Sequence, residues 1–194
     1  MRGLYLGVPK GFHSGGRMTQ QQIIISGVGG QGVLFVTRLL AEAAIQKGMP
    51  VVTSETHGMA QRGGTVISHL KVGDFSSVLI RPRHADGLLA LKEENILQHG
   101  HYLKENGWSI VNCPDSKAME IDKPVYGIDA NRLAIENQAR RSVNLILLGY
   151  ALKFRGHLFC GFKDIKAVLS NRFSKREKLL NSAMKALNAG YHAA

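Results

Sequence analysis

A run of glycines between an apolar stretch and a helix-forming stretch places the tightest constraint on the fold of this chain. The largely apolar residues Ile23–Ser26 predict a buried strand, and the segment that starts at Val33 predicts a helix. Gly27–Gly32 lies between them and has the spacing GxGxxG. Glycines let the backbone turn tightly, and the free amide groups at a helix N-terminus stabilise an anion. We therefore expect a strand–turn–helix unit whose turn faces an anionic ligand or a partner chain.

A second glycine-bearing segment, Ser54–Gly64, follows the next predicted strand, Val51–Thr53. In open α/β sheets, ligands bind beyond the carboxyl ends of the strands. Because both loops follow strands that point to that edge, we expect them to form one composite site. The candidate site residues of the two loops are Gly27, Gly29, Gly30, Gln31, Gly32, Glu55, His57, Gly58, Gln61, Arg62, Gly63 and Gly64.

Arg62 is the candidate best suited to an anionic ligand. Its planar guanidinium can hold a carboxylate or a phosphate through two parallel hydrogen bonds. We assign no catalytic residue in either loop. Two simpler interpretations stay open: Gly63 and Gly64 merely turn the chain into the next strand, and His57 is an ordinary polar loop residue.

Strands and helices alternate along the chain. We expect strands at Ile23–Ser26, Val51–Thr53, Thr65–Val72, Gly87–Leu91, Trp108–Asn112 and Val125–Ile128, with Val78–Ile80 pairing back after a turn. We expect helices at about Val33–Lys47, Lys92–Asn106, Asn131–Lys153, Lys163–Asn171 and Lys175–Leu187. Thr65–Val72 alternates apolar and polar residues, which is typical of a strand with one wet face. The pattern predicts a single three-layer α/β domain, Rossmann-like, with a mostly parallel sheet and helices on both faces.

The first residues differ from the rest in composition. Residues 1–21 are rich in glycine, basic and polar residues, lack periodicity, and include a second methionine, Met18. They contain no apolar segment of about 7–15 residues, so we do not expect a secretory signal. We expect residues 1–21 to be a disordered extension or the product of an upstream start codon, and the domain to occupy residues 22–194.

The formal net charge of +11 raises nucleic acid as a partner. The basic residues, among them Arg140–Arg141, are scattered along the chain and do not line one helix face. No nucleic-acid recognition motif accompanies them, so we expect no nucleic-acid binding. An acidic protein partner or an anionic ligand accounts for the charge equally well. The sequence has no run of about 20 apolar residues, and we expect no membrane partner.

The cysteines and histidines do not form a metal-binding pattern. Cys113 and Cys160 are far apart, and His99 and His101 are not one helical turn apart. Zinc and iron–sulfur sites generally use about four protein ligands. We therefore expect no metal site and no cluster in this chain, and two buried thiols in a cytoplasmic protein.

An NAD(P)-binding protein similar to a dehydrogenase is one interpretation of the first loop. Glu55 follows Gly32 by a little over twenty residues, where an acid binds the ribose in the dinucleotide-binding fold. Against this interpretation, the chain leaves no room for a substrate domain, and the second loop is too specialised to supply a ribose acid alone. We keep it as an alternative.

Taken together, the two loops resemble the gamma-type subunit of 2-oxoacid:ferredoxin oxidoreductases. The segment HGMAQRGG at residues 57–64 is most similar to the beta subunit of indolepyruvate ferredoxin oxidoreductase. The resemblance covers about Gln22 to Tyr191 and includes Ala85–Leu91 and the segment from Asn144 to Gly149. The two motifs are specific together, although the first alone is weak.

The resemblance implies a role as an accessory subunit that is inactive alone. Enzymes of this family oxidatively decarboxylate a 2-oxoacid with coenzyme A and pass two electrons to ferredoxin. Thiamine diphosphate, Mg²⁺ and iron–sulfur clusters are then expected in a partner subunit, because this chain has neither a thiamine-binding segment nor cluster cysteines. The two loops would complete the partner's active site and contact substrate, coenzyme A or the partner.

Two questions remain open at this stage. The sequence does not identify the 2-oxoacid substrate. The resemblance favours a substrate similar to indolepyruvate, and pyruvate and 2-oxoglutarate are the alternatives. A pure scaffold role, with the loops serving the subunit interface, is also open. The chain is expected to form a complex with the catalytic subunit, and a homodimer is the alternative when the chain is produced alone.

Overall fold

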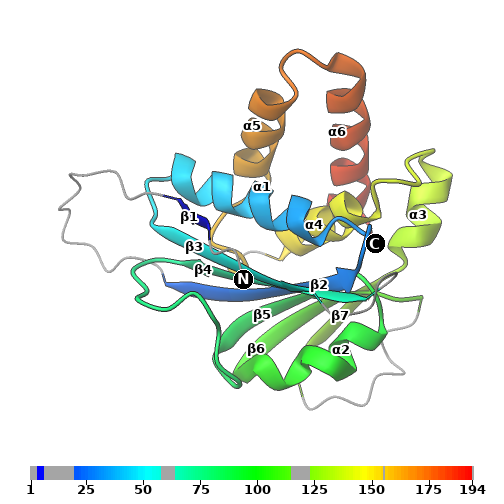
Figure 1. The fold of residues 1–194 in the computed structure, drawn as a ribbon. Helices are drawn as coiled ribbons and strands as arrows, with labels where there is room; N and C mark the ends of the chain where they lie inside the picture. The colour runs from blue at the N-terminus through cyan, green and yellow to red at the C-terminus, as the bar shows by residue number, and fades with distance from the viewer. Residues whose placement is uncertain (1–3, 7–19, 58–63, 115–122, 155, 194) are drawn as a thin grey trace.

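The computed structural model describes residues 4–6, 20–57, 64–114, 123–154 and 156–193. Its centre is a mixed sheet of seven strands in the order β1-β3-β4-β2-β5-β6-β7 (Figure 1). The strands are β1 (Leu4–Leu6), β2 (Gln21–Val28), β3 (Val51–His57), β4 (Thr65–Val72), β5 (Ala85–Ala90), β6 (Leu103–Asn112) and β7 (Val125–Ile128).

The strands on one side of β2 are all parallel to it, whereas the strands on the other side alternate in direction. β2, β5, β6 and β7 are parallel neighbours, as strands joined by helical crossovers are. β4 lies antiparallel between β2 and β3, and β1 is antiparallel to β3. The expectation of a mostly parallel sheet therefore holds for β2, β5, β6 and β7 and not for the other half. β4 is antiparallel to β3 because the connection between them is short, and a parallel neighbour would need a crossover of a dozen or more residues.

Helices cover the two faces of the sheet unequally (Figure 1). One face carries α1 (Val33–Gln46) and α4 (Val143–Lys153), and α5 (Phe162–Arg172) and α6 (Glu177–Tyr191) stand above them. The other face carries the short α2 (Glu94–His99), followed by a 3₁₀ turn. α3 (Ala130–Glu136) lies at the end of the sheet near β7. Helices on both faces agree with the prediction.

The buried residues of the central strands contribute to two separate hydrophobic cores, one on each face of the sheet. Ile23 and Ile25 of β2 point into the core beneath α1 and α4, whereas Ile24 points into the core beneath α2. Because both faces of β2 are buried, its apolar residues form a continuous run rather than an alternating one. α4 is buried along nearly its whole length between the sheet and α6.

Two predicted helices are shorter in the structure. The helix expected over Lys92–Asn106 ends at His99, and the chain from Leu103 is already strand β6, because Leu103 is buried in the core and pairs with Ala85. The helix expected over Asn131–Lys153 is interrupted between Glu136 and Val143. Gln138 adopts a positive φ of 56° there, which a helix does not allow.

The strand expected at Val78–Ile80 is absent from the structure, which describes these residues as irregular backbone. Side chains of β4 take the hydrogen bonds that a strand partner would supply. Lys71 Nζ donates to the carbonyl of Leu79 at 3.1 Å, and the amide of Ile80 donates to His69 Nδ1 at 3.2 Å. These contacts also cover the face of β4 that was expected to be wet, because His69 and Lys71 are buried.

Part of the segment 1–21 belongs to the sheet. Leu4–Leu6 pairs with Val51–Thr53, and Gln21 is the first residue of β2. The Gln21 side chain joins two distant parts of the fold, because its Oε1 accepts from the amide of Phe159 at 2.9 Å. Residues 1–3 and 7–19 lie outside the described part, so the interpretation of this segment as an extension stays a prediction.

Candidate functional site

The two predicted loops begin at the same edge of the sheet. Gly27 of β2 and His57 of β3 both pair with Val66, so the two strands end at the same level with β4 between them. The loops also touch, because the amide of Gly29 donates to the carbonyl of Gly64 at 3.1 Å. The structure thus brings the described parts of the two loops together, although their strands are not immediate neighbours.

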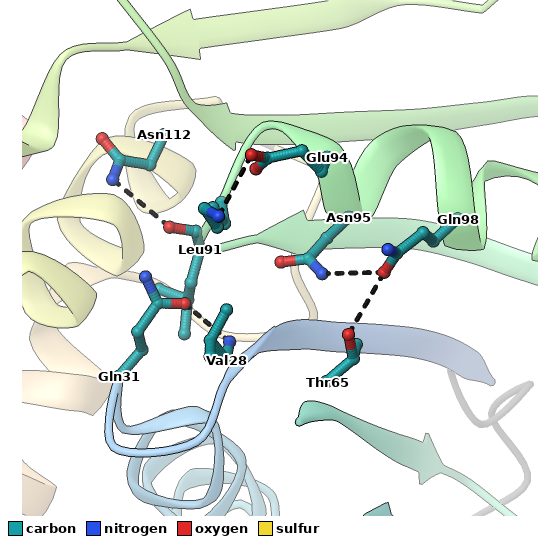
Figure 2. A network of polar contacts seen from close by, with 9 residues as sticks. Val28, Gln31, Thr65, Leu91, Glu94, Asn95, Gln98 and Asn112 are labelled. Atoms are coloured by element: carbon teal, nitrogen blue, oxygen red, sulfur yellow. Dashed lines mark hydrogen bonds and ion pairs between the residues drawn. The ribbon is translucent and has the colours of Figure 1, made fainter. Parts of the chain in front are cut away.

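The first loop is a folded turn held by its own glutamine. Gln31 Oε1 accepts from the amide of Val28 at 2.7 Å, and the amide of Gln31 donates back to the carbonyl of Val28 at 3.0 Å (Figure 2). Gly30 and Gly32 adopt φ values of 90° and 84°, which glycine reaches without strain. Gln31 is therefore a structural element of the turn through its oxygen, and its amide nitrogen is directed elsewhere.

The turn ends at the N-terminus of α1. Gly32 is the N-cap residue and brings no side chain to cap the first amides, and the first turn of α1 contains no acidic residue. Uncapped amides at a helix N-terminus carry partial positive charge. This end of α1 suits an anion, as the glycine spacing predicts.

The structure describes only some of the candidates in the second loop. Glu55 lies in β3 opposite Ser68 and is half-buried, and His57 is the last residue of that strand. Gly64 lies directly before β4. Gly58, Gln61, Arg62 and Gly63 lie outside the described residues, so their position relative to the first loop remains a prediction.

The strand order also bears on the dinucleotide alternative. The dinucleotide-binding fold places its ribose-binding acid on the strand beside the glycine turn. Here β4 separates β3 from β2, so Glu55 lies two strand spacings, about 10 Å, from the strand that carries the turn. The sheet therefore does not reproduce the arrangement that this alternative requires.

A pocket of about 450 Å³ opens beside the first loop, beyond the carboxyl ends of the parallel strands. It is lined by Gly30, Gln31, Leu91, Asn131, Arg140, Arg141 and Val143. A second pocket of about 420 Å³ lies on the other side of the same loop. Its lining is largely apolar and includes Val33, Leu34 and Phe35 of α1.

A buried asparagine, Asn112, holds together the backbone segments next to the first pocket. Asn112, at the end of β6, donates from Nδ2 to the carbonyl of Leu91 at 3.3 Å (Figure 2). Its Oδ1 accepts from the amide of Ala130 at 2.9 Å. One side chain thus ties the ends of β5 and β6 to the start of α3. Because Asn131 follows Ala130, this link also fixes the backbone that carries one of the lining residues.

Sequence reasoning missed Asn131, Arg140 and Arg141 as members of the site. The expected helix over Asn131–Lys153 placed the two arginines in a helix interior, whereas they lie in the connection between α3 and α4. Ser142, a residue favoured at helix N-termini, stands directly before α4 and was the available signal for a new helix start.

The cysteines are buried, as expected. Cys113 lies in the core beneath α2 and Cys160 in the core beneath α4, and neither forms a disulfide bond. Burial raises the pKa of the Cys160 thiol to about 12, so this thiol stays protonated near neutral pH. Within the described part of the chain, no three histidine, cysteine or acidic residues are grouped so that they could hold a metal ion. The same part contains no helix long and apolar enough to cross a membrane.

Comparison with known proteins identifies the family. The family model described as pyruvate ferredoxin/flavodoxin oxidoreductase matches residues 22–193. The indolepyruvate oxidoreductase subunit IorB of Archaeoglobus fulgidus is 31% identical over 192 residues, covering 89% of this chain and 94% of that protein. The IorB subunit of Pyrococcus horikoshii is 30% identical, covering 91% and 97% of the two chains.

Solved structures share the fold. The pyruvate oxidoreductase subunit PORC of Thermotoga maritima aligns with a TM-score of 0.74 at 22% identity, over 89% of this chain and 95% of that one. The 2-oxoglutarate:ferredoxin oxidoreductase of Magnetococcus marinus, solved with 2-oxoglutarate, coenzyme A and succinyl-CoA bound, aligns with a TM-score of 0.73 at 24% identity, over 90% of this chain and 31% of that one. The chain therefore belongs to the pyruvate ferredoxin/flavodoxin oxidoreductase family, as a gamma-type subunit of a 2-oxoacid:ferredoxin oxidoreductase.

Proposed function

We propose that this subunit completes the active site of a partner subunit that carries thiamine diphosphate, Mg²⁺ and iron–sulfur clusters. The complex would oxidatively decarboxylate a 2-oxoacid, transfer the acyl group to coenzyme A and pass two electrons to ferredoxin in the cytoplasm. Indolepyruvate is the 2-oxoacid we favour, because the similar subunits of Archaeoglobus fulgidus and Pyrococcus horikoshii are named for it. Pyruvate and 2-oxoglutarate are the competing substrates to test.

The observation that carries this proposal is the contact between the two glycine loops. The hydrogen bond from Gly29 to Gly64 places exposed glycine backbone at the edge of the sheet where ligands bind in α/β folds. Backbone without side chains allows a large ligand or a second chain to approach closely. Pockets on both sides of the first loop leave room for such an approach.

Coenzyme A is the proposed co-substrate at this edge. It brings several phosphates, and the uncapped end of α1 together with the net charge of +11 favours an anion. A homologous enzyme binds coenzyme A in its solved structure. Thiamine diphosphate supplies the carbanion chemistry when bound in the partner, and this chain would orient substrate and shield the site from water.

Reconstitution of the complex tests the proposal. The partner subunit alone should turn over indolepyruvate slowly or not at all, and addition of this chain should restore the rate. Comparing kcat/KM for indolepyruvate, pyruvate and 2-oxoglutarate then identifies the substrate. Full activity of the partner without this chain would contradict the proposal.

A second measurement separates an active-site role from a scaffold role. Gln61→Ala in the second loop should lower turnover while the complex still assembles. Lys185→Ala on the exposed side of α6 is the matched control and should change neither property. If Gln61→Ala instead prevents assembly, the loop serves the interface.

A further inference from the structure

The hairpin that α5 and α6 form above α1 carries a large share of the positive charge of the chain (Figure 1). Residues 162–191 contain seven lysine and arginine residues and two acidic residues, which gives +5 of the total +11. Four of the seven basic residues are exposed and lie where α5 ends and α6 begins, namely Arg172, Lys175, Arg176 and Lys178. A surface of this charge suits an acidic partner, because opposite charges attract at the contact and steer association.

A groove of about 520 Å³ opens at the turn between α5 and α6. The described residues of its lining include no acidic residue and are Phe35, Arg172, Phe173, Ser174, Lys175 and Arg176. The rings of Phe35 and Phe173 are partly buried against the core beneath α1 and α4, with their centroids 6.4 Å apart. This groove, which we call the basic groove, thus combines aromatic contact surface with exposed positive charge.

The contacts of Arg172 favour a protein ligand over a nucleic acid. Arg172 pairs with Glu42 of α1, and its guanidinium carbon lies 5.6 Å from the centre of the Phe35 ring. Nucleic-acid bases bind in basic grooves by stacking on free aromatic faces. Here Arg172 already lies over Phe35, and the Phe173 ring is tilted by 37° to it, so the two rings offer no parallel faces for stacked bases. Lys175 and Arg176 remain as the cations for the carboxylates of a protein.

The basic groove continues the surface that the partner subunit would cover. The second pocket beside the first loop also has Phe35 and Arg172 in its lining, so the pocket and the groove adjoin. That pocket adds Leu34 and Arg38 of α1. A partner that packs on the glycine loops and continues along α1 therefore reaches the basic groove. An apolar centre with a charged rim is the usual anatomy of a protein–protein interface.

We propose that the basic groove receives an acidic segment of the partner subunit. An apolar side chain of that segment packs on Phe35 and Phe173, and its carboxylates bind Lys175 and Arg176. The inference rests on the proposed function in one respect, because it takes the catalytic subunit of that complex as the partner. It assigns an interaction surface that lies outside both glycine loops, and it specifies the charge of the surface that meets it.

The affinity between the two purified subunits tests the assignment. The double variant Lys175→Glu/Arg176→Glu should bind the partner subunit at least tenfold more weakly, because it sets carboxylates against carboxylates. Its dissociation constant should also rise less with NaCl concentration than that of the wild type. Lys163→Glu/Lys166→Glu is the matched control and should bind like the wild type, because it makes the same change of charge at two exposed residues of α5 outside the groove. Equal affinities of the two double variants would overturn the proposal.

A zero-length carbodiimide cross-link identifies the occupant of the groove, because this reagent joins a lysine to a carboxylate in contact with it. In the native complex we expect Lys175 to be linked to an aspartate or glutamate of the partner subunit. A link from Lys175 to a second copy of this chain would overturn the proposal. So would binding of RNA that Lys175→Glu/Arg176→Glu loses while its affinity for the partner stays unchanged. Neither readout is turnover, so a partner that is active without this chain contradicts the proposed function and leaves this test intact.

Discussion

Gly32 and Asn144 lie so close that the fold leaves no room for a side chain at residue 32. A Cβ atom on Gly32 would lie 2.1 Å from Asn144 Nδ2, and Gly32 already has a φ of 84°. The two residues are 112 positions apart and join the start of α1 to the first turn of α4. This contact holds the glycine turn against the helix that follows Arg140 and Arg141, so it fixes both sides of the pocket that opens beside the first loop.

We expect Gly32→Ala to lower the stability of the chain by more than the left-handed backbone alone explains. That backbone costs an alanine roughly 1–2 kcal/mol. Gly48→Ala is the control, because Gly48 has a φ of 70° and open space around its Cβ position. Urea unfolding of the two variants measures the difference. In an Asn144→Ala background the excess cost of Gly32→Ala should disappear, and persistence of the excess would contradict the steric explanation.

Gly190→Ala should destabilise the chain strongly because it separates α6 from α4. A Cβ atom on Gly190 would lie 1.9 Å from the carbonyl oxygen of Ile146. Because this oxygen belongs to the backbone of α4, it cannot rotate away as a flexible side chain could. The expected loss of unfolding free energy is roughly 3 kcal/mol or more, or failure to fold. Asn188→Ala, at an exposed position of the same helix, should be close to neutral in the same urea titration. Equal stability of the two variants would show that the helices readjust.

The stability of the chain should fall on acidification because of His69. Burial, with smaller contributions from His99 and Lys71, lowers the pKa of His69 from 6.5 to about 4. The unfolded chain therefore binds a proton at His69 that the folded chain does not bind between these two pH values. This contribution to stability is complete above about pH 6.5 and decreases as the pH falls toward 4.

Melting temperatures measured from pH 7.5 to 4.5 test the assignment to His69. His69→Gln retains an acceptor for the amide of Ile80 and removes the titrating group, so its melting temperature should depend less on pH. His84→Gln, at an exposed histidine, should retain the slope of the wild type. A wild-type slope in His69→Gln would assign the pH dependence to another group.

Arg62→Lys should lower turnover of the assembled enzyme on the order of tenfold, corresponding to about 1.4 kcal/mol. Lysine keeps the charge and loses the planar fork that binds an anion through two hydrogen bonds. Arg62→Ala should be slower still, with assembly intact in both variants. The alternative is an ion pair with Glu55 that only holds the loop. In that case Glu55→Gln and Arg62→Lys should both lower the melting temperature of the isolated chain, and an unchanged rate for Arg62→Ala would exclude the active-site role.

Local patterns predicted the parts of the fold whose signals lie within one element. Thr65–Val72 and Val125–Ile128 are strands with the expected bounds, and the glycine turn leads into a helix that starts at Val33 as predicted. Turn chemistry and hydrophobic periodicity depend on neighbouring residues, so the sequence alone determined these elements. The specific pairing of the two loop motifs identified the family for the same reason.

Tertiary structure decided which surfaces are buried and which distant residues meet. His69 and Lys71 are buried because residues 79 and 80 lie across them, an arrangement that strand periodicity does not encode. Asn144 meets Gly32 only because α4 packs beside α1 on one face of the sheet. Likewise, Arg140 and Arg141 line the pocket beside the first loop because the helical segment is interrupted between α3 and α4. This interruption lies at the edge of the sheet where β2 ends. The sequence determined the turn and the strands, whereas packing of residues far apart in the chain decided the pocket.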